Sequence, residues 1–317
     1  MIQDDGNCTE PSDDAADPGI HSSRSPSPPP GKVSAGDNGN SPSGGTGHSG
    51  DRPRGSRFEV LRMKPHDHIG WVFSGPGEFH VLAEPFLAEG ASRNERLMYV
   101  AEDPVRRDFG EWTQSLYPGT LTVTSIAEVY GPSGIVDASK QRATFAQVLT
   151  ESLAEGYSGI RVAADNTPLV LDQERLASWV RWESVADHFM AENQVTGLCA
   201  FDRTRIDVER LRDLAALHPL GSAEGPKPPF RLFTQERALW LEGVLTPLSV
   251  GQAELALESL PARTDLVVAV QGQIVASDAF SALRRLTEAG VVVTVRGATA
   301  QMREVGRSAG LPGACFS

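Results

Sequence analysis

The stretch from residue 66 to residue 103 constrains the fold more than any other part of the chain. Residues 69–73 form a short apolar run typical of a buried strand, and the Gly and Pro residues that follow predict a turn. Apolar side chains then recur at helical spacing from Glu78, which is expected to open a helix that Gly90 ends. A second apolar strand completes a βαβ unit, and such a unit predicts a parallel sheet.

The loop between the first strand and this helix is the expected place of a ligand-binding site. Ligands of open parallel sheets bind beyond the carboxyl ends of the strands. A phosphate-binding loop needs glycines, a Lys and a Ser or Thr. Gly75 and Gly77 are present, but Glu78 follows where a phosphate would need positive charge. The architecture of an ATPase is therefore predicted without its reacting residues, and we expect no enzymatic activity.

The alternation of strands and helices continues through residues 58–220. Further strands are predicted at 121–125, 159–165 and 197–202. Aspartate is a favoured N-terminal cap, and it precedes three segments of helical periodicity, at Asp137, Asp172 and Asp207. This order specifies an α/β fold.

Two segments of low apolar content flank this domain, and a second domain follows. Residues 1–57 are rich in Ser, Gly, Pro and Asp and are expected to be a disordered tail, whereas 221–229 are interpreted as a linker. Residues 230–317 show a smaller α/β pattern, with strands at 239–243, 266–270 and 291–295. Ser249 is expected to cap its first helix, and Ser277 or Asp278 to open its second.

Composition excludes several classes of partner and compartment. The formal net charge of −12 argues against nucleic acid, which needs clustered Lys and Arg. Cys8, Cys199 and Cys315 are too few and too scattered for a disulfide framework, so a reducing compartment fits best. The polar N-terminus does not read as a signal peptide, and no apolar run approaches the ~20 residues of a membrane span. We therefore expect a cytoplasmic location without membrane contact.

Five side chains are predicted to line a ligand pocket at the strand ends. Asp165 and Asp202 end two strands, at positions where ATPases hold magnesium, and without a Lys they are interpreted as orienting a ligand or capping a loop. Arg161, inside an apolar strand, needs an acidic partner if it is buried. His68 and Ser74 flank the first strand and complete the set.

A metal site is weighed and not expected. His66 and His68 lie on one side of a strand and, with His80, His188 or Cys199, supply ligand types that metals use. The chain has no HExxH motif and no paired-Cys pattern. No metal or cofactor is therefore predicted. His68 is interpreted as a hydrogen-bonded residue beside the sheet, and Cys199 as a small apolar core residue.

Residues 65–220 resemble the MEDS (methanogen/methylotroph sensory) domain. The resemblance rests on the order and spacing of several short pieces, which are His68, 85–90 (PFLAEG), 95–100 (ERLMYV), Tyr130, 156–162 (GYSGIRV), 199–202 (CAFD) and 218–219 (HP). It implies a degenerate relative of RecA-like P-loop ATPases that is used for sensing an unknown small molecule. The family usually has an acidic residue and then an aromatic after the strand of Arg161. This chain has Asp165 followed by Asn-Thr-Pro.

Residues 230–316 resemble the STAS domain, the fold of anti-sigma-factor antagonists. In antagonist members a partner kinase phosphorylates the second Ser of an Asp-Ser-Ser-Gly stretch at the start of a helix. Residues 276–279 read Ala-Ser-Asp-Ala, so Asp278 stands at the acceptor position and Ser277 one position early. Asp278 either mimics a phosphate weakly or caps the helix.

The sequence thus predicts a cytoplasmic regulatory protein that couples a sensory domain to a protein–protein contact. The resemblance implies an anti-sigma factor or a related kinase-like regulator as the partner. Two alternatives stay open: a RecA-like nucleotide-binding enzyme, which ATP turnover would reveal, and a scaffold that senses nothing.

Overall fold

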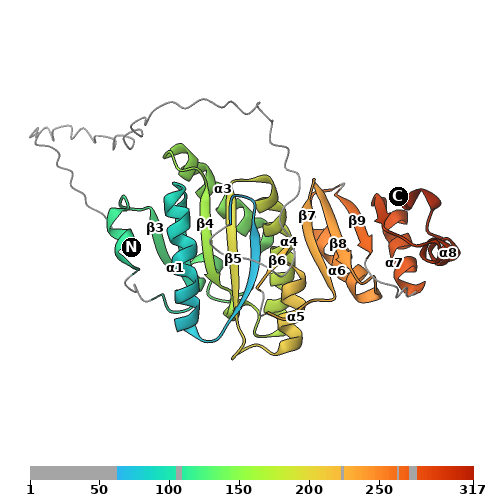
Figure 1. Ribbon diagram of the computed structural model, residues 1–317, viewed down its shortest axis with the longest axis horizontal. Coiled ribbons are helices and arrows are strands. Elements are labelled where there is room, and N and C mark those ends of the chain that lie inside the picture. Colours follow the sequence, from blue (N-terminus) through green and yellow to red (C-terminus); the bar gives the residue numbers. More distant parts are fainter. Residues whose placement is uncertain (1–62, 105–108, 223–224, 263, 271–276) are drawn as a thin grey trace, which may run out of the picture. The chain divides into compact units, whose positions relative to one another are not determined.

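The computed structural model describes residues 63–104, 109–222, 225–262, 264–270 and 277–317. The predicted disordered tail at 1–57 and the loop at 271–273 lie outside these residues. The chain folds into two sheets with helices packed against them (Figure 1), which confirms the α/β class. No helix among the described residues combines the length and the apolar character that a membrane crossing needs.

The first sheet has six strands in the order β3-β2-β4-β5-β1-β6, and every neighbouring pair is parallel. Its strands are β1 (His68–Phe73), β2 (Arg96–Ala101), β3 (Leu121–Ser125), β4 (Ile160–Asp165), β5 (Val195–Asp202) and β6 (Leu220–Gly221). The two central strands β4 and β5 are buried along their whole length, because helices cover both faces of the sheet. This burial explains why they read as continuous apolar runs in the sequence.

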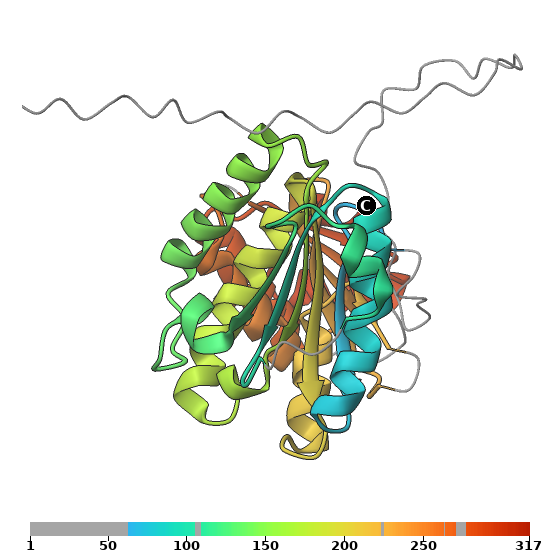
Figure 2. The same ribbon diagram turned by 90° about the vertical axis from the view of Figure 1, so that its left-hand side faces the viewer.

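Helices lie on both faces of the first sheet. They are α1 (Pro76–Ser92), α2 (Ile126–Tyr130), α3 (Ala138–Ala154), α4 (Gln173–Glu192) and α5 (Val208–Ala216), with 3₁₀ turns at Glu111–Ser115 and Thr167–Leu169. Figure 2 shows the sheet edge-on, with α1 on one side and α3 and α4 on the other. The predicted caps are confirmed, since the carboxylates of Asp137, Asp172 and Asp207 each accept a backbone N–H in the first turn of α3, α4 and α5.

The second sheet has four strands in the order β10-β9-β8-β7. Its elements are β7 (Phe230–Gln235), β8 (Ala238–Gly243), α6 (Pro247–Ser259), β9 (Asp265–Val270), α7 (Ser277–Glu288), β10 (Val293–Arg296), α8 (Ala300–Ser308) and a 3₁₀ turn at Gly313–Cys315. The strand β7 pairs antiparallel with β8, and the other pairs are parallel. The sequence pattern does not predict β7, nor β6, which spans the expected boundary between the first domain and the linker.

One expected helix start is shifted by local capping chemistry, and another is confirmed. Thr246 caps α6, because its hydroxyl accepts the N–H of Ser249 and Ser249 returns a bond to the N–H of Thr246. The prediction that Ser249 is the cap is therefore wrong. Helix α7 begins at Ser277, which is one of its two predicted starts. Asp278 lies in the first turn and not at the cap position, and its charge there suits the helix dipole.

Gly90 does not end α1, which continues to Ser92. A Cβ on Gly90 would lie 2.5 Å from Cδ and 2.8 Å from Nε of Arg161. Arg161 is fully buried on β4, where it forms an ion pair with Glu95 and donates to the carbonyl of Met63. The acidic partner predicted for Arg161 is thus confirmed. A glycine at position 90 leaves space for Cδ and Nε of the arginine side chain.

We expect Gly90→Ala to lower the free energy of unfolding by about 1–3 kcal/mol. Overpacking against Arg161 outweighs the helical preference of Ala, which is worth only about 1 kcal/mol. Gly251 of α6 is the matched control because it is exposed and a Cβ added to it would meet no atom within 4 Å, so Gly251→Ala should be neutral or stabilising. Urea unfolding measures both variants, and equal effects of the two would contradict the prediction.

Candidate functional site

Three of the five predicted pocket residues lie at the carboxyl ends of the strands. Asp202 accepts hydrogen bonds from the N–H of Gly75, at 3.2 Å, and from the N–H and hydroxyl of Thr204. Asp165 accepts the N–H of Thr167 at 3.1 Å. These contacts cap the loops that follow β1, β4 and β5, which fits the loop-capping interpretation of the two aspartates.

The glycine loop after β1 is bound by a carboxylate from the first turn of α1. The N–H of Ser74 donates to Oε2 of Glu78 in the first turn of α1, and Ser74 is exposed. Gly75 has a φ of 78°, a conformation that favours glycine, and it forms the turn into the helix. The position that a phosphate would take at a helix N-terminus is therefore next to a fixed negative charge.

His68 and Arg161 lie away from these three residues. Each is at the beginning of its strand, His68 as the first residue of β1 and Arg161 as the second of β4. They also face opposite sides of the sheet, because Arg161 packs on Phe86 of α1 while His68 contacts α4. The prediction that all five residues line one pocket is therefore wrong, and any ligand-binding role of the individual residues stays a prediction.

His68 instead belongs to a cluster of four buried side chains, which we call the His–Glu–Cys cluster. It comprises His68 of β1, Glu183 of α4, Cys199 of β5 and His218 from the loop before β6. His68, Glu183 and His218 have no exposed surface, and Cys199 is 8% exposed. One ligand-type atom of each residue lies within 4.8 Å of those of the other three.

The contacts inside the cluster centre on one carboxylate. Nε2 of His68 and Nε2 of His218 each lie 2.8 Å from Oε1 of Glu183. Nε2 of His68 is also 3.4 Å from Sγ of Cys199. The two rings lie against each other, with their centroids 4.5 Å apart. Four elements distant in the sequence therefore meet at this carboxylate.

The outer nitrogens of both histidines are held by acceptors. Nδ1 of His68 lies 3.0 Å from Oδ1 of Asp187, one helical turn after Glu183. Nδ1 of His218 lies 2.8 Å from the carbonyl oxygen of Leu214. A carbonyl and a carboxylate only accept, so Nδ1 carries the proton in both rings, and each Nε2 faces inward.

Two glycines make room for the rings. A Cβ on Gly70 of β1 would lie 2.8 Å from Cγ and Nδ1 of His218. A Cβ on Gly197 of β5 would lie 2.6 Å from Sδ of Met190 and 3.3 Å from Cδ2 of His68. Neither contact would be allowed for a larger residue without displacing a ring or α4.

The cluster shifts the acidity of its members strongly. Burial opposes ionisation of the Glu183 carboxyl, but His218 and His68 outweigh burial and hold its pKa at about 2. Burial likewise opposes protonation of His218, and the charge of Glu183 overcomes it and raises the pKa of that ring to about 9. The pKa of His68 is also raised well above its usual value, against burial, by Glu183 and by its neighbours Cys199 and Asp187.

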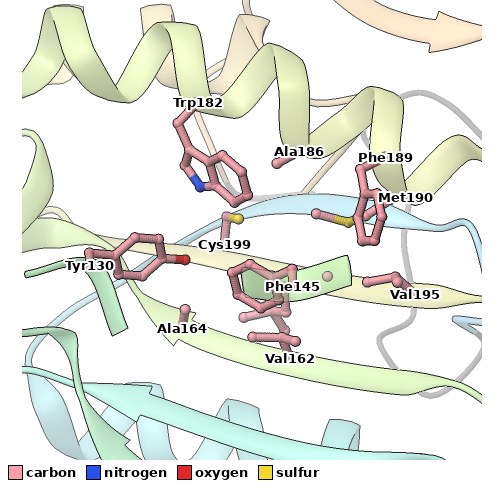
Figure 3. Close-up of a pocket in the computed structure, with 12 residues that line it drawn as sticks. Tyr130, Phe145, Val162, Ala164, Trp182, Ala186, Phe189, Met190, Val195 and Cys199 are labelled. Atoms are coloured by element: carbon pink, nitrogen blue, oxygen red, sulfur yellow. The ribbon is translucent and has the colours of Figure 1, made fainter. Parts of the chain in front are cut away.

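An apolar cavity of about 30 Å³ adjoins the cluster at Cys199 (Figure 3). Figure 3 shows Trp182, Ala186, Phe189 and Met190 of α4 facing the sheet across it. The remaining lining residues are Tyr130, Phe145, Val162, Ala164, Val195, Gly197, Leu198 and Cys199. The volume is room for about two water-sized groups. Because the lining is almost wholly apolar, the cavity suits a small apolar molecule better than water.

A surface hollow of about 550 Å³ lies next to this cavity. Phe189 lines both spaces. The other walls of the hollow include Arg142 of α3, Glu192 at the end of α4, and the turn between β7 and β8.

Asp187 also connects the cluster to the second sheet. Its Oδ1 binds Nδ1 of His68, and its Oδ2 accepts the backbone N–H of Thr234 in β7. Asp187 is 2% exposed and Thr234 is 1% exposed. The two oxygens of one buried carboxylate thus bond the site on one side and the edge strand of the second sheet on the other.

Sequence reasoning found only part of this site. It named His68 and considered Cys199 as a possible ligand, but Cys199 was assigned to the core. His218 enters the sequence analysis only as part of the family resemblance, and Glu183 is not singled out there. A usable signal is present in α4, where Glu183 and Asp187 stand four residues apart on a face that also carries buried Trp179, Ala186 and Met190.

The sequence was compared with known families and proteins. Residues 67–219 match the family model described as MEDS, the MEthanogen/methylotroph, DcmR Sensory domain. No curated protein matches the chain. The matched segment begins one residue before β1, ends one residue before β6, and contains the whole His–Glu–Cys cluster together with Asp187. The predicted resemblance of this part of the chain is thus confirmed, and the similarity to a sensory domain supports a sensing or regulatory role for the protein.

Proposed function

We propose that the protein is a regulatory sensor that detects a small apolar molecule in the cavity beside Cys199. Helix α4 reports its presence to the second sheet, which contacts a partner protein. The observation that carries this proposal is that the two oxygens of the Asp187 carboxylate have different partners. One is hydrogen-bonded to His68 at the site and the other to the N–H of Thr234 in β7. The same helix supplies four walls of the cavity, so a ligand that moves α4 moves this carboxylate.

The cavity limits the size and the affinity of the ligand. A volume of about 30 Å³ admits a molecule of about two or three non-hydrogen atoms. The best small ligands gain about 1.5 kcal/mol per such atom, so contacts with the apolar walls alone give a Kd no tighter than about 1 mM. Detection at lower concentration needs an additional strong contact, and the nearest groups able to make one are those of the cluster.

Hydrogen–deuterium exchange of the full chain with xenon or ethanol at millimolar concentration tests the coupling. We expect either probe to slow amide exchange in α4 and also in β7. In Asp187→Asn the effect in β7 should be lost while that in α4 remains, because an amide has one acceptor oxygen and cannot serve both partners. Glu174→Gln, an exposed change in the first turn of the same helix, is the matched control and should retain both effects.

Ala164→Val supplies the test of location. It adds two methyl groups to the cavity wall from β4, so it should abolish the response to both probes in α4 and β7. A response of β7 that survives in Asp187→Asn, or a response of α4 that survives in Ala164→Val, would contradict the proposed route.

The output side of the proposal concerns the start of α7. Ser277 and Asp278 are both exposed there. The resemblance of residues 230–316 to STAS domains motivates an anti-sigma factor or a kinase-like regulator as the partner. A carboxylate at position 278 fixes the charge of this surface, so the contact is proposed to lack phosphorylation control at that position.

We expect wild-type protein to bind such an anti-sigma factor weakly, and Asp278→Ser to bind it more tightly. Added kinase should reverse the gain in the variant by restoring negative charge. Pull-down of candidate anti-sigma factors with both forms measures the difference. Unchanged binding in Asp278→Ser would mean that Asp278 only stabilises the start of α7. Phosphate on Ser277 of the wild type would show that phosphorylation control persists one residue away.

We also expect no ATP hydrolysis. The loop after β1 lacks a Lys, and the N–H of Ser74 is already bonded by the carboxylate of Glu78. Steady-state phosphate release by the full chain with ATP and Mg²⁺ should equal the background without protein. Release above background that disappears in Asp165→Asn would instead favour a RecA-like enzyme.

A further inference from the structure

We propose that His68, Glu183, Cys199 and His218 bind one transition-metal ion of the zinc class between the first sheet and α4. The four residues supply two imidazole nitrogens, one carboxylate oxygen and one sulfur, and these are the ligand types that zinc takes in proteins. Soft sulfur and imidazole donors select zinc-like ions over magnesium and calcium, which prefer oxygen.

The orientation of the two imidazoles fits metal ligation. Both Nδ1 atoms are held from outside, that of His68 by Asp187 and that of His218 by the carbonyl of Leu214. In the neutral ring this arrangement keeps the proton on Nδ1 and leaves the lone pair on Nε2, so a bound metal ion takes the place of the Nε2 proton. Histidine ligands of metals are usually held in this way, by a carboxylate or a carbonyl on the second nitrogen.

The contacts at Glu183 favour a shared ion over direct hydrogen bonds. Each Nε2 is 2.8 Å from Oε1, yet among the described residues neither oxygen of Glu183 has a hydrogen-bond partner, and Nε2 of His218 has none. The short contacts therefore lack hydrogen-bond alignment. A buried carboxylate needs a positive partner, and a metal ion bound by all three atoms would provide that charge in place of the protonated rings.

Three of the ligand-atom separations need only a small change to accept the ion, and the others lie within 4.8 Å. Ligand atoms 2.0–2.1 Å from a tetrahedral zinc are about 3.3 Å from one another. The two N···O separations of 2.8 Å would widen by about half an ångström, and the Nε2–Sγ separation is already 3.4 Å. The cavity beside Cys199 gives α4 a free volume into which such an adjustment can relax.

Metal content of the full chain is the first test. The protein is stripped with a chelator under reducing conditions and then loaded with Zn²⁺ alone. We expect about one zinc per chain and a rise in Tm of roughly 5–10 °C at 100 times the Kd, because the ion binds only the folded state. His218→Gln should lose both, whereas the control His188→Gln should keep both, since that ring, on the same helix as Glu183, lies outside the cluster.

Cobalt provides a readout that does not depend on the stability of a variant. Co²⁺ bound to a thiolate shows a sulfur-to-metal charge-transfer absorption, which wild-type protein should display. Cys199→Ser should abolish this band. Cys315→Ser is the matched control, because Cys315 is also a free cysteine that is 8% exposed, and Cys8→Ser controls for the remaining thiol. Both controls should keep the band.

Two results would overturn the proposal. The first is stripped, folded wild-type protein that takes up neither Zn²⁺ nor Co²⁺, which would leave the cluster as an ion network of histidines and carboxylates. The second is uptake that survives in His218→Gln, with the cobalt band retained in Cys199→Ser, which would put the ion elsewhere. Neither result bears on the exchange response to xenon, so the failure of this inference is distinguishable from failure of the proposed sensor.

Discussion

A carboxylate with no exposed surface has to be balanced by positive charge, and that requirement at Glu183 organises the centre of the first domain. The charge comes from two imidazoles that reach the same oxygen from β1 and from the loop before β6. The position of α4 over the sheet is therefore tied to β1 and to the loop before β6. Gly70 and Gly197 follow from the same requirement, because any side chain at either position would displace a ring or the helix.

The alternation of strands and helices could be predicted from the sequence because parallel strands covered on both faces are apolar along their length. The caps Asp137, Asp172 and Asp207 could be predicted because a helix cap depends on only a few consecutive residues. The errors have a different origin. Gly90 reads as a helix end, but it is small because Arg161, on a strand far along the chain, needs the space. The strands β6 and β7 are too short or too mixed in polarity to stand out from the residues around them.

The site was less predictable than the fold, and the reason is physical. The rule that ligands lie at the carboxyl ends of parallel strands reflects helix N-termini and loops that gather there. At those ends this protein has Asp165 and Asp202 engaged in loop capping, and Glu78 bonded to the N–H of Ser74. The polar cluster lies instead within the layer between the sheet and α4, where side chains alone provide the chemistry. Each member has an ordinary interpretation when taken singly, and only the strand register β5-β1-β6 brings them together.

The second sheet enters this network through its edge. The strand β7 is the last of four, so its outward N–H groups face no further strand among the described residues. Asp187 satisfies one of them, at Thr234, with the oxygen that His68 does not use. Because Glu183 and Asp187 are one turn apart on α4, a shift of the helix changes the distance from the site to both partners at once. Apolar packing alone would permit α4 to move along β7. The buried carboxylate of Asp187 opposes this movement, because the movement would break its hydrogen bonds with His68 and Thr234. In the proposed sensor, a change at the cluster is thus transmitted to β7 through the geometry of the Asp187 carboxylate.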